Sequence, residues 1–499
     1  MMQPFMFPEK SLGDDLVSAL RRLNPWWEGR PGVQLPSTRR HLVRQIQRRL
    51  ETRLAPIVVV RGPRQIGKTT AQLQVLQDLL DAGVPPRQIL RVQCDEIPAM
   101  MGQSEPILRV VEWFERVILG KTLNEAARDG EKTFLFFDEV QNLRSWAEQL
   151  KHLVDTSTTQ VVVTGSSALR IEQGRDSLAG RITGIESGVL SLTEISLFHG
   201  TPLGDPFLQD NGLGVLAEDS FWRDLASHGQ TVSSARNAVF KEFSDRGGYP
   251  LVHTHQNVEW AALADQLNET VIKRVIQHDL RVGERGRKRD AQLLEEVFRL
   301  ACRYVGQSPA AATLAREARR SLNANIGDQR ATHYLRFLGD TLLLRLIDPL
   351  EIRLKRKGGN AKICLADHGL RASWLQEMIP LDADGLEANP HLSDLAGRIA
   401  ESVAGAVLST VNGLDIAHLP ERGKDPEVDF VLTVGTRRIP LEVKYQRRID
   451  PQRDTRGLRA FMEKEANNAP FGVLVCREDY TLSDPDIVAL PLSTLMLLR

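Results

Sequence analysis

The sequence predicts an α/β protein of several domains. The first observation is a β-branched run, Ile57-Val58-Val59-Val60, that leads through a glycine-rich loop into a helical stretch from Thr69 to Asp81. The second is the alternation of strand-like and helix-like segments from Pro56 to about Phe198, which is typical of a parallel sheet. The third is the length of 499 residues, enough for about three domains.

The loop after the first strand has the phosphate-binding spacing Gly-x4-Gly-Lys-Thr. Its glycines let backbone N–H groups surround an anion, and the following helix directs its positive end at the same point. Lys68 is expected to reach the β- and γ-phosphates of ATP, and the Thr69 hydroxyl to hold magnesium. The predicted nucleotide-binding residues are Gly62, Pro63, Arg64, Gln65, Ile66, Gly67, Lys68, Thr69 and Thr70.

A later apolar strand, Thr133 to Phe137, ends in Asp138-Glu139. Such an ending downstream of a P-loop predicts that Asp138 holds magnesium through water and that Glu139 acts as general base toward the attacking water. The alternative is a strand followed by an acidic helix cap. Ile89 to Asp95 is predicted as a further strand of the sheet.

Two positions after the next strand, Val161 to Val163, are further candidates for the catalytic site. Ser166, or its neighbour Ser167, is predicted to orient the water as a sensor, with helix capping as the alternative. Arg181 is predicted to act as an arginine finger in a neighbouring subunit's site, with a surface salt bridge as the alternative.

The middle of the chain predicts a winged helix. Three helical stretches, Leu293 to Tyr304, Ala310 to Arg320 and Asp328 to Leu346, precede a hairpin built from Glu351 to Asn360 and Ala361 to Ala366. Residues 270–362 contain twenty Lys and Arg against ten Asp and Glu in a chain of zero net charge. This excess predicts phosphate contacts with DNA, and the alternative is a solvated basic face. The predicted contacts are Gln329, Arg330, His333, Arg336, Arg353, Lys355, Arg356 and Lys357.

The C-terminal part carries a second group of charged residues. A helix from Gly397 to Leu408 contains Glu401, a strand from Glu427 to Val434 contains Asp429, and its hairpin partner from Arg438 to Tyr445 contains Glu442 and Lys444. Strand alternation puts Glu442 and Lys444 on one face. Glu401, Asp429 and Glu442 are predicted to hold magnesium while Lys444 positions water for phosphodiester cleavage. A structural hairpin with solvated charges is the alternative.

Composition limits the class of protein. No run reaches the roughly 18 apolar residues of a membrane span, and the first ten residues lack the pattern of a signal peptide. Four widely spaced cysteines are expected to be buried free thiols of a cytoplasmic protein. The N-terminal helix Asp14 to Leu23 and Trp26-Trp27 are expected to pack on the next domain, with base stacking as the alternative for the tryptophans.

With these motifs in place, the chain resembles the bacterial and archaeal AAA-family ATPases that carry a C-terminal restriction-endonuclease-like domain of PD-(D/E)XK type. The resemblance covers about 440 residues. It rests on the P-loop, the Asp138 and Glu139 strand, the C-terminal cluster and a few shorter segments. Those segments are Thr164-Gly165-Ser166-Ser167, Leu178-Ala179-Gly180-Arg181, Gly247-Gly248-Tyr249-Pro250 and Leu365-Ala366-Asp367-His368-Gly369-Leu370.

The resemblance implies an AAA+/ASCE-type P-loop NTPase with a parallel sheet and a helical lid, then a winged helix and a restriction-endonuclease-like α/β domain. The expected layout is an N-terminal extension (1–40), an ATPase core (41–200), a lid (201–280), the winged helix (281–380) and the nuclease-like domain (381–499). Residues 201–230 look like an insertion.

The predicted function is an ATP- and Mg²⁺-dependent ATPase that binds and remodels duplex or branched DNA by translocation or branch migration. It includes metal-dependent cleavage as a further activity. A homo-oligomer is expected, with a hexamer as one form. The alternative is a nucleotide-controlled regulatory switch whose C-terminal domain is only a binding module.

Overall fold

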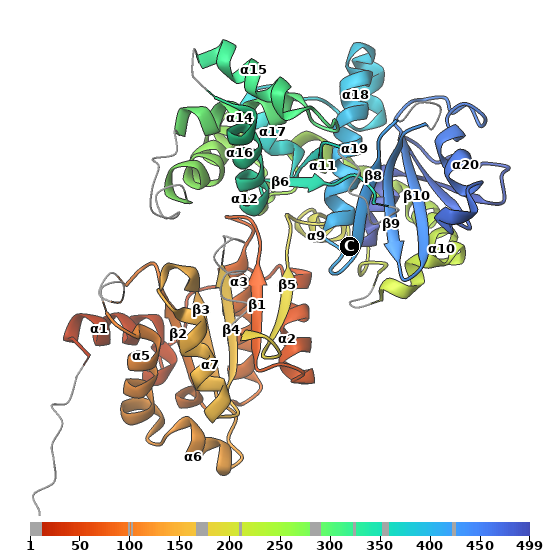
Figure 1. Cartoon of the computed structure of the whole chain (residues 1–499). Helices are drawn as coiled ribbons and strands as arrows, with labels where there is room; N and C mark the ends of the chain where they lie inside the picture. Colours follow the sequence, from red (N-terminus) through yellow and green to blue (C-terminus); the bar gives the residue numbers. More distant parts are fainter. Residues whose placement is uncertain are drawn as a thin grey trace, which may run out of the picture. The chain divides into compact units, whose positions relative to one another are not determined.

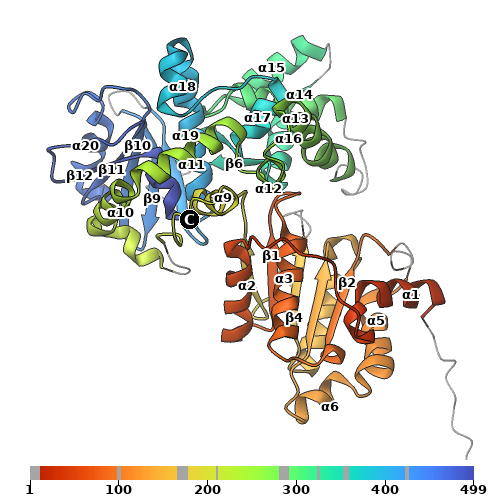
Figure 2. The ribbon, with the colours of Figure 1, turned by 180° about the vertical axis from the view of Figure 1, so that it is seen from behind.

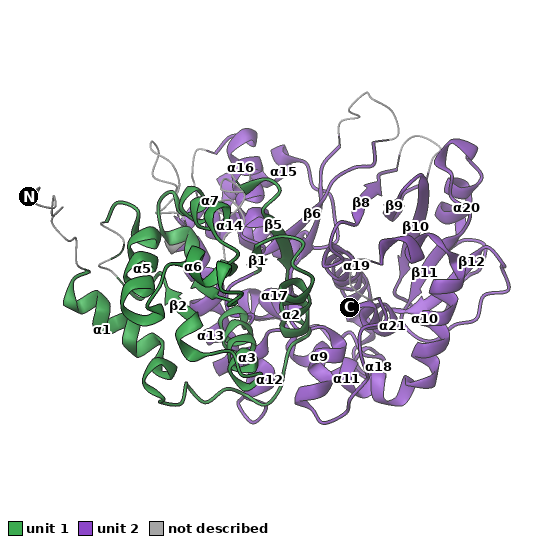
Figure 3. Ribbon diagram, turned by 90° about the horizontal axis from the view of Figure 1, so that it is seen from below, with its two compact units in different colours: residues 1–62, 67–187 green, residues 63–66, 188–499 purple. Residues whose placement is uncertain are grey.

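The computed structural model describes residues 12–97, 100, 103–165, 178–208, 212–279, 291–322, 326–351, 359–421 and 426–499. The chain divides into two compact units (Figure 3). Unit 1 comprises residues 1–62 and 67–187, and unit 2 comprises residues 63–66 and 188–499. No helix within the described ranges has both the length and the apolar character needed to cross a bilayer.

Unit 1 is built on a five-stranded parallel sheet (Figure 1). Its strands are β1 (Ile57–Arg61), β2 (Ile89–Gln93), β3 (Phe134–Asp138), β4 (Gln160–Gly165) and β5 (Ile182–Glu186), in the order β2-β3-β4-β1-β5. β4 lies between the P-loop strand β1 and the strand β3 that ends in Asp138, the order expected of an AAA+/ASCE-type sheet. The predicted α/β fold class is therefore confirmed; β5 was missing from the prediction.

Helices cover both faces of this sheet, as Figures 1 and 2 show. α2 (His41–Thr52) and α3 (Lys68–Asp81) pack on one face, where Val58, Val60 and Phe136 are buried. The opposite face is covered by α5 (Pro106–Phe114) and α7 (Trp146–Thr156). Strands buried on both sides read as continuous apolar runs, which is why they were visible in the sequence. Shorter helices are η2 (Pro86–Gln88), η3 (Glu115–Leu119), α6 (Leu123–Arg128) and η4 (Val140–Asn142).

The N-terminal extension is part of unit 1. α1 (Asp14–Leu23) has the predicted bounds and buries Leu16 and Leu20 in the core. η1 (Pro25–Glu28) lies along the edge strand β2, where the indole N–H groups of Trp26 and Trp27 donate to the carbonyl of Ile89 at 3.3 and 2.9 Å. This confirms the predicted packing of the two tryptophans. It also covers a sheet edge that would otherwise expose unpaired backbone groups.

Unit 2 begins with a series of helices, of which the first falls in the predicted ATPase core and the others in the predicted lid (201–280). They are α9 (Leu192–Phe198), η6 (Leu213–Ala217), α10 (Asp219–Thr231), α11 (Ser233–Arg246), α12 (Pro250–Thr254), α13 (Trp260–Leu267), η7 (Asn268–Lys273) and η8 (Val275–Asp279). α10 and α11 pack on the C-terminal α21 (Leu492–Leu495), and α10 also packs on β12 (Ile487–Pro491). Arg236 of α11 is buried and donates to Thr494 at 2.6 Å and to Asp479 at 2.7 Å. The supposed insertion thus covers the C-terminal domain.

Three helices and a strand pair follow. α14 (Ala291–Arg303) and α15 (Ala311–Leu322) are close to the predicted helices, whereas α16 (Asp328–Asp340) starts as predicted but ends six residues before the predicted Leu346. β7 (Lys362–Leu365) pairs antiparallel with β6 (Leu344–Ile347), a strand that the sequence did not predict, and residues 352–358 of the predicted hairpin lie outside the described residues. Leu342 adopts a φ of 62°, a left-handed conformation that ends helical geometry before β6.

Two sequence motifs meet at the start of α17 (His368–Leu375). The buried Asp367 accepts hydrogen bonds from the amides of Gly248 at 2.5 Å and Gly369 at 2.7 Å. A Cβ built at Gly247 would lie 2.3 Å from an Asp367 oxygen, so only glycine fits. Tyr249 is fully buried. Gly247-Gly248-Tyr249-Pro250 is therefore a packed docking segment within unit 2.

The C-terminal part is a five-stranded mixed sheet in the order β12-β11-β10-β9-β8. β8 (Asp415–Leu419), β9 (Val428–Val434) and β10 (Arg437–Lys444) are antiparallel, while β10, β11 (Gly472–Cys476) and β12 are parallel. α19 (Ser393–Ser409) packs against β10 and β7, and α20 (Arg456–Met462) against β10 and β11. Short helices are α18 (Ala383–Ala388), η9 (Pro390–Leu392), η10 (Glu465–Asn467) and η11 (Met496–Leu498). All four cysteines are free and buried, as predicted.

Candidate nucleotide site and C-terminal acidic cluster

Three predicted residues of the nucleotide site meet at the carboxyl ends of β1 and β3. Lys68 is buried and donates from Nζ to the carbonyl of Gly62 at 2.9 Å. The Thr69 hydroxyl donates to Asp138 Oδ2 at 2.7 Å. The residues between, Pro63 to Ile66, form the loop that joins β1 to α3, and Gln65 and Gly67 have φ values of 62° and 88°. One hydroxyl beside one carboxylate suits Mg²⁺, which keeps most of its waters in protein sites.

Thr164, near the end of β4, also belongs to the nucleotide site. It was not selected in the sequence analysis. Its hydroxyl donates to Asp138 Oδ1, and the amide of Glu139 donates to the Thr164 oxygen at 3.4 Å. The predicted sensor, Ser166, lies outside the described residues. The Thr164 hydroxyl, two positions before Ser166 in the same Thr-Gly-Ser-Ser segment, was an equally visible candidate.

Glu139, the predicted base, has a φ of 51°, which is rare for a residue with a side chain. Its carboxylate accepts a hydrogen bond from Gln141 at 2.5 Å and is partly exposed. Uncommon backbone geometry is frequent at functional sites, where the surrounding fold enforces it. Asp138 is buried while Glu139 reaches solvent, so the two acids occupy different environments.

Arg91, in the centre of β2, is a further charged neighbour of this site that the sequence interpretation missed. Its guanidinium is buried, lies 3.7 Å from Asp138 Oδ2 and donates to Gln93 at 3.0 Å. The Arg91 backbone is held by the buried Asn24, which accepts from the Arg91 amide at 2.7 Å and donates to the Arg91 carbonyl at 2.8 Å. An arginine inside the apolar run Ile-Leu-Arg-Val was the available signal.

Arg181 lies at the other end of the sheet from the P-loop. Its carbonyl accepts from the amide of Ile57, the first residue of β1, at 3.0 Å. Its guanidinium forms a two-point ion pair with Asp155 of α7, with distances of 2.5 and 3.0 Å. The geometry within this chain matches the salt-bridge alternative, and an arginine-finger role would require this pair to open.

The predicted DNA contacts of α16 share one exposed face. Arg330, His333 and Arg336 are exposed and spaced three residues apart, so each lies beside the next on the helix surface. Arg330 also donates to the Tyr334 hydroxyl at 2.9 Å, which fixes its guanidinium over that ring. Gln329 is exposed next to them. The wing residues Arg353, Lys355, Arg356 and Lys357 lie outside the described residues.

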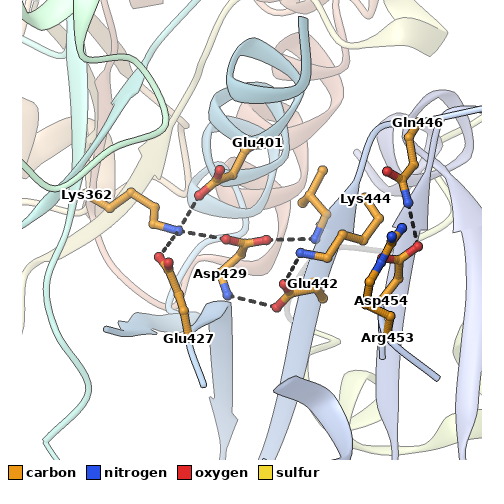
Figure 4. Close-up of polar contacts among 10 residues, drawn as sticks. Lys362, Glu401, Glu427, Asp429, Glu442, Lys444, Gln446, Arg453 and Asp454 are labelled. Carbon is orange, nitrogen blue, oxygen red and sulfur yellow. Dashed lines mark hydrogen bonds and ion pairs between the residues drawn. The ribbon is translucent and has the colours of Figure 1, made fainter. Parts of the chain in front are cut away.

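The C-terminal charged residues come together as predicted, but around a lysine (Figure 4). Lys362 of β7 is 1% exposed and its Nζ contacts Glu401, Asp429 Oδ1 at 3.0 Å and Glu427 Oε1 at 3.4 Å. Lys444 donates to Glu442 Oε1 at 2.5 Å. Lys362 was missed, although a lysine within the apolar strand Ala361 to Ala366 was visible in the sequence.

The carboxylates of this cluster differ in their ionisation. Burial and the charge of Asp429 raise the pKa of Glu401 well above its usual range, and Lys362 offsets this only in part. Burial alone would raise the pKa of Asp429, but Lys362 and the Val443 amide lower it. Burial and Asp429 raise the pKa of Glu442 to about 8. Of these three carboxyl groups, only Asp429 has its pKa lowered.

The two lysines of the cluster stay protonated. Burial by itself lowers the pKa of Lys362, but Asp429, Glu401 and Glu427 together raise it well above its usual range. Burial likewise lowers the pKa of Lys444, and Glu442 more than offsets this. The cluster is thus a network of ammonium and carboxylate groups.

This arrangement does not fit the predicted magnesium site of Glu401, Asp429 and Glu442. Asp429 gives one oxygen to Lys362 and the other to the Val443 amide at 2.9 Å, and Glu442 gives one oxygen to Lys444. Within the described ranges, no three His, Cys, Asp or Glu side chains are placed to hold a metal ion. The Lys362 ammonium thus lies against two members of the predicted metal set, Glu401 and Asp429.

Comparison with known proteins supports the nucleotide site rather than the C-terminal cluster. Residues 54–196 match a family model described as an AAA domain. The P-loop, β3 and β4 lie within this range, and so does the five-stranded parallel sheet. Residues 54–196 form an AAA domain. Residues 238–380 and 396–495 match two families described only as domains of unknown function.

Relatives and solved structures add little about the activity. An uncharacterized protein of Methanocaldococcus jannaschii is 27% identical over 135 residues, which are 27% of this chain and 26% of that protein. One of Haemophilus influenzae is 24% identical over 328 residues, 63% of this chain and 68% of that protein. The chain thus spans about a quarter of the first relative and about two thirds of the second.

Among solved structures, Drosophila ORC bound to DNA is 16% identical, with 75% of this chain and 95% of that chain covered at a TM-score of 0.24. A DNA replication initiation factor is 12% identical, with 63% and 91% covered at 0.24. A structure on katanin self-assembly is 15% identical, with 41% and 61% covered at 0.21. TM-scores this low do not support an inference about function.

Proposed function

We propose that this chain is an ATP-hydrolysing AAA+ protein that binds and remodels DNA by translocation or branch migration. The observation that carries the ATPase proposal is the group formed by Thr69, Asp138 and Thr164 beside Lys68, at the carboxyl ends of parallel strands. Ligands of open α/β sheets bind at that edge. The AAA domain match over residues 54–196 supports the same proposal.

In this proposal the P-loop amides and Lys68 bind the phosphates of ATP. Thr69 and Asp138 hold a magnesium ion, which neutralises the charge that develops on the phosphates. Glu139 accepts the proton of the attacking water, and its carboxylate is partly exposed while that of Asp138 is buried. Thr164 fixes the orientation of Asp138 and of the Glu139 backbone through its hydroxyl.

The DNA proposal rests on α16 and the segment around it. Arg330, His333 and Arg336 present one exposed basic face on the third of three helices, which precede an antiparallel strand pair as in a winged helix. The surrounding residues 270–362 carry twice as many basic as acidic residues. The wing residues Arg353, Lys355, Arg356 and Lys357 belong to the same proposed interface.

A homo-oligomer, with a hexamer as one form, belongs to this proposal. The nucleotide would then lie between subunits, with Arg181 of one subunit entering the site of the next. That role requires the Arg181–Asp155 pair to break, which costs little because both side chains are at least a third exposed.

A second candidate is the nucleotide-controlled switch whose C-terminal domain only binds. The buried Lys362 among the acids favours it over a nuclease. In this candidate ATP sets an assembly state, and cleavage of DNA plays no part.

The ATPase proposal is tested with Lys68→Ala and Glu139→Gln, measured as steady-state hydrolysis and as binding of a fluorescent ATP analogue in magnesium. Lys68→Ala is expected to lose both hydrolysis and binding of the analogue. Glu139→Gln is expected to bind the analogue but to hydrolyse ATP more slowly by a factor of about 10² or greater. Lys132→Ala, an exposed lysine of unit 1, is the matched control and should resemble the wild type. Normal hydrolysis by Lys68→Ala would show that ATP is not bound at this loop.

A further inference from the structure

Lys362 is buried among the carboxyl groups of Glu401, Glu427, Asp429 and Glu442, which we call the C-terminal acidic cluster. It comes from β7, outside the C-terminal five-stranded sheet, and reaches carboxylates of α19, β9 and the residue before β9. Its Nζ lies 3.0 Å from Asp429 and 3.4 Å from Glu427, and also contacts Glu401 (Figure 4). A buried ammonium is tolerated only where anionic partners compensate its lost hydration.

The position of this ammonium is the one that a metal ion would need. Oxygens of Glu401 and Asp429 converge on it from two elements, which is the arrangement expected around a hard cation. The remaining oxygens of Asp429 and Glu442 are bound by the Val443 and Asp429 amides, at 2.9 and 3.4 Å, and by Lys444. A magnesium ion and the Lys362 ammonium cannot share this space, because the two positive charges would repel at short range.

The packing around β7 keeps Lys362 in place. The amide of Leu365 donates to the Ser402 hydroxyl of α19 at 2.8 Å. The sulfur of Cys364 would lie 2.6 Å from a Cβ at Gly405, so β7 and α19 approach closely only because residue 405 is glycine. These contacts hold the β7 backbone against α19, so the backbone of Lys362 stays beside the cluster.

We propose that the Lys362 ammonium is the cation bound by the C-terminal acidic cluster. The cluster thus binds this side chain of β7 instead of a divalent metal ion. The C-terminal domain then acts as a binding module that holds the β6–β7 strand pair against α19 and β9. This inference is independent of the ATPase proposal, because it concerns residues of unit 2 only.

The test counts Mn²⁺ ions bound to the full chain without nucleotide, by electron paramagnetic resonance titration. Wild type and Asp429→Asn should bind Mn²⁺ alike, since Asp429 is already paired. Lys362→Gln should gain one site, and the double variant Lys362→Gln/Asp429→Asn should lose it again. Lys362→Arg, which keeps the positive charge, is the matched control and should gain none. Weak Mn²⁺ binding near Asp138 is expected in all of these chains, so it does not affect the difference in the number of Mn²⁺ ions bound.

Two results would overturn the proposal. One is a wild-type Mn²⁺ site that disappears in Asp429→Asn. The other is a Lys362→Gln chain that keeps the wild-type circular dichroism spectrum but binds no additional Mn²⁺. If Lys362→Gln does not fold, the comparison of wild type with Asp429→Asn decides alone. Loss or retention of ATP hydrolysis in these variants does not enter the test.

Discussion

Removing the Asn24 side chain should loosen the edge strand that carries Arg91 beside Asp138. Asn24 is fully buried, and its amide group makes three hydrogen bonds to backbone. It donates to Leu20 at 2.8 Å and to the Arg91 carbonyl at 2.8 Å, and accepts from the Arg91 amide at 2.7 Å. Asn24→Ala leaves both backbone groups of Arg91 without these partners.

The expected cost follows from those two groups. An unpaired buried donor or acceptor costs about 1–3 kcal/mol. Two such groups give about 2–6 kcal/mol, and water entering the space left by the side chain reduces this toward the lower end. A loss of about 2 kcal/mol should raise the opening equilibrium of β2 about 30-fold.

Hydrogen exchange followed by mass spectrometry measures this opening locally. The peptide that contains β2 should exchange about 30-fold faster in Asn24→Ala, while the peptide that contains β4 should not change. Arg21→Ala, which removes an ion pair between side chains that are 43% and 36% exposed, is the matched control. Unchanged exchange of β2 in Asn24→Ala would refute the role assigned to this asparagine.

Three other predictions concern single residues. Thr164→Val should slow ATP hydrolysis about 10- to 100-fold, because a hydrogen bond to a charged group contributes about 1.5–3 kcal/mol, whereas Thr164→Ser should hydrolyse ATP near the wild-type rate. Gly248→Ala should lower the unfolding free energy by about 1–3 kcal/mol, since its Cβ would lie 3.0 Å from the Leu190 carbonyl oxygen; urea unfolding measures it, and no loss would contradict the close packing. Burial lowers the pKa of His253 to about 4, so the unfolded chain binds the extra proton first and stability should fall by up to about 3 kcal/mol as the pH drops from 6.5 to 4. A His253→Gln variant should lack this part of the pH dependence.

The sequence predicted the structure best where a run of consecutive residues is buried or has a fixed spacing. The strands of unit 1 are apolar on both faces, and the loop from Gly62 to Thr70 has a fixed spacing set by phosphate binding. Both are properties of contiguous residues, which explains why β1, β3 and the α3 start were predicted well. β9 and β10 were also predicted, because they alternate around Asp429 and Glu442.

Contacts between distant segments were not accessible in this way. Lys362 lies 39 residues before Glu401 and 67 before Asp429. Nothing in the local pattern links them, so three acids and Lys444 suggested a metal site. The same limit applies to Asn24, which holds a backbone 67 residues away. The β6 strand was hidden because Leu344 continues the helical periodicity of α16, while the break occurs in the backbone at Leu342.

The proposed link between ATP hydrolysis and DNA is tested most directly by one rate. Steady-state ATP hydrolysis is measured with and without duplex or four-way-junction DNA, for wild type and for Arg330→Ala/His333→Ala/Arg336→Ala. Arg223→Ala/Lys241→Ala, which removes exposed cations from α10 and α11, is the control. We expect DNA to stimulate the wild type and the control, and the triple variant to keep its basal rate but lose the stimulation. Hydrolysis by the wild type that is indifferent to every form of DNA would contradict it and favour the nucleotide-controlled switch.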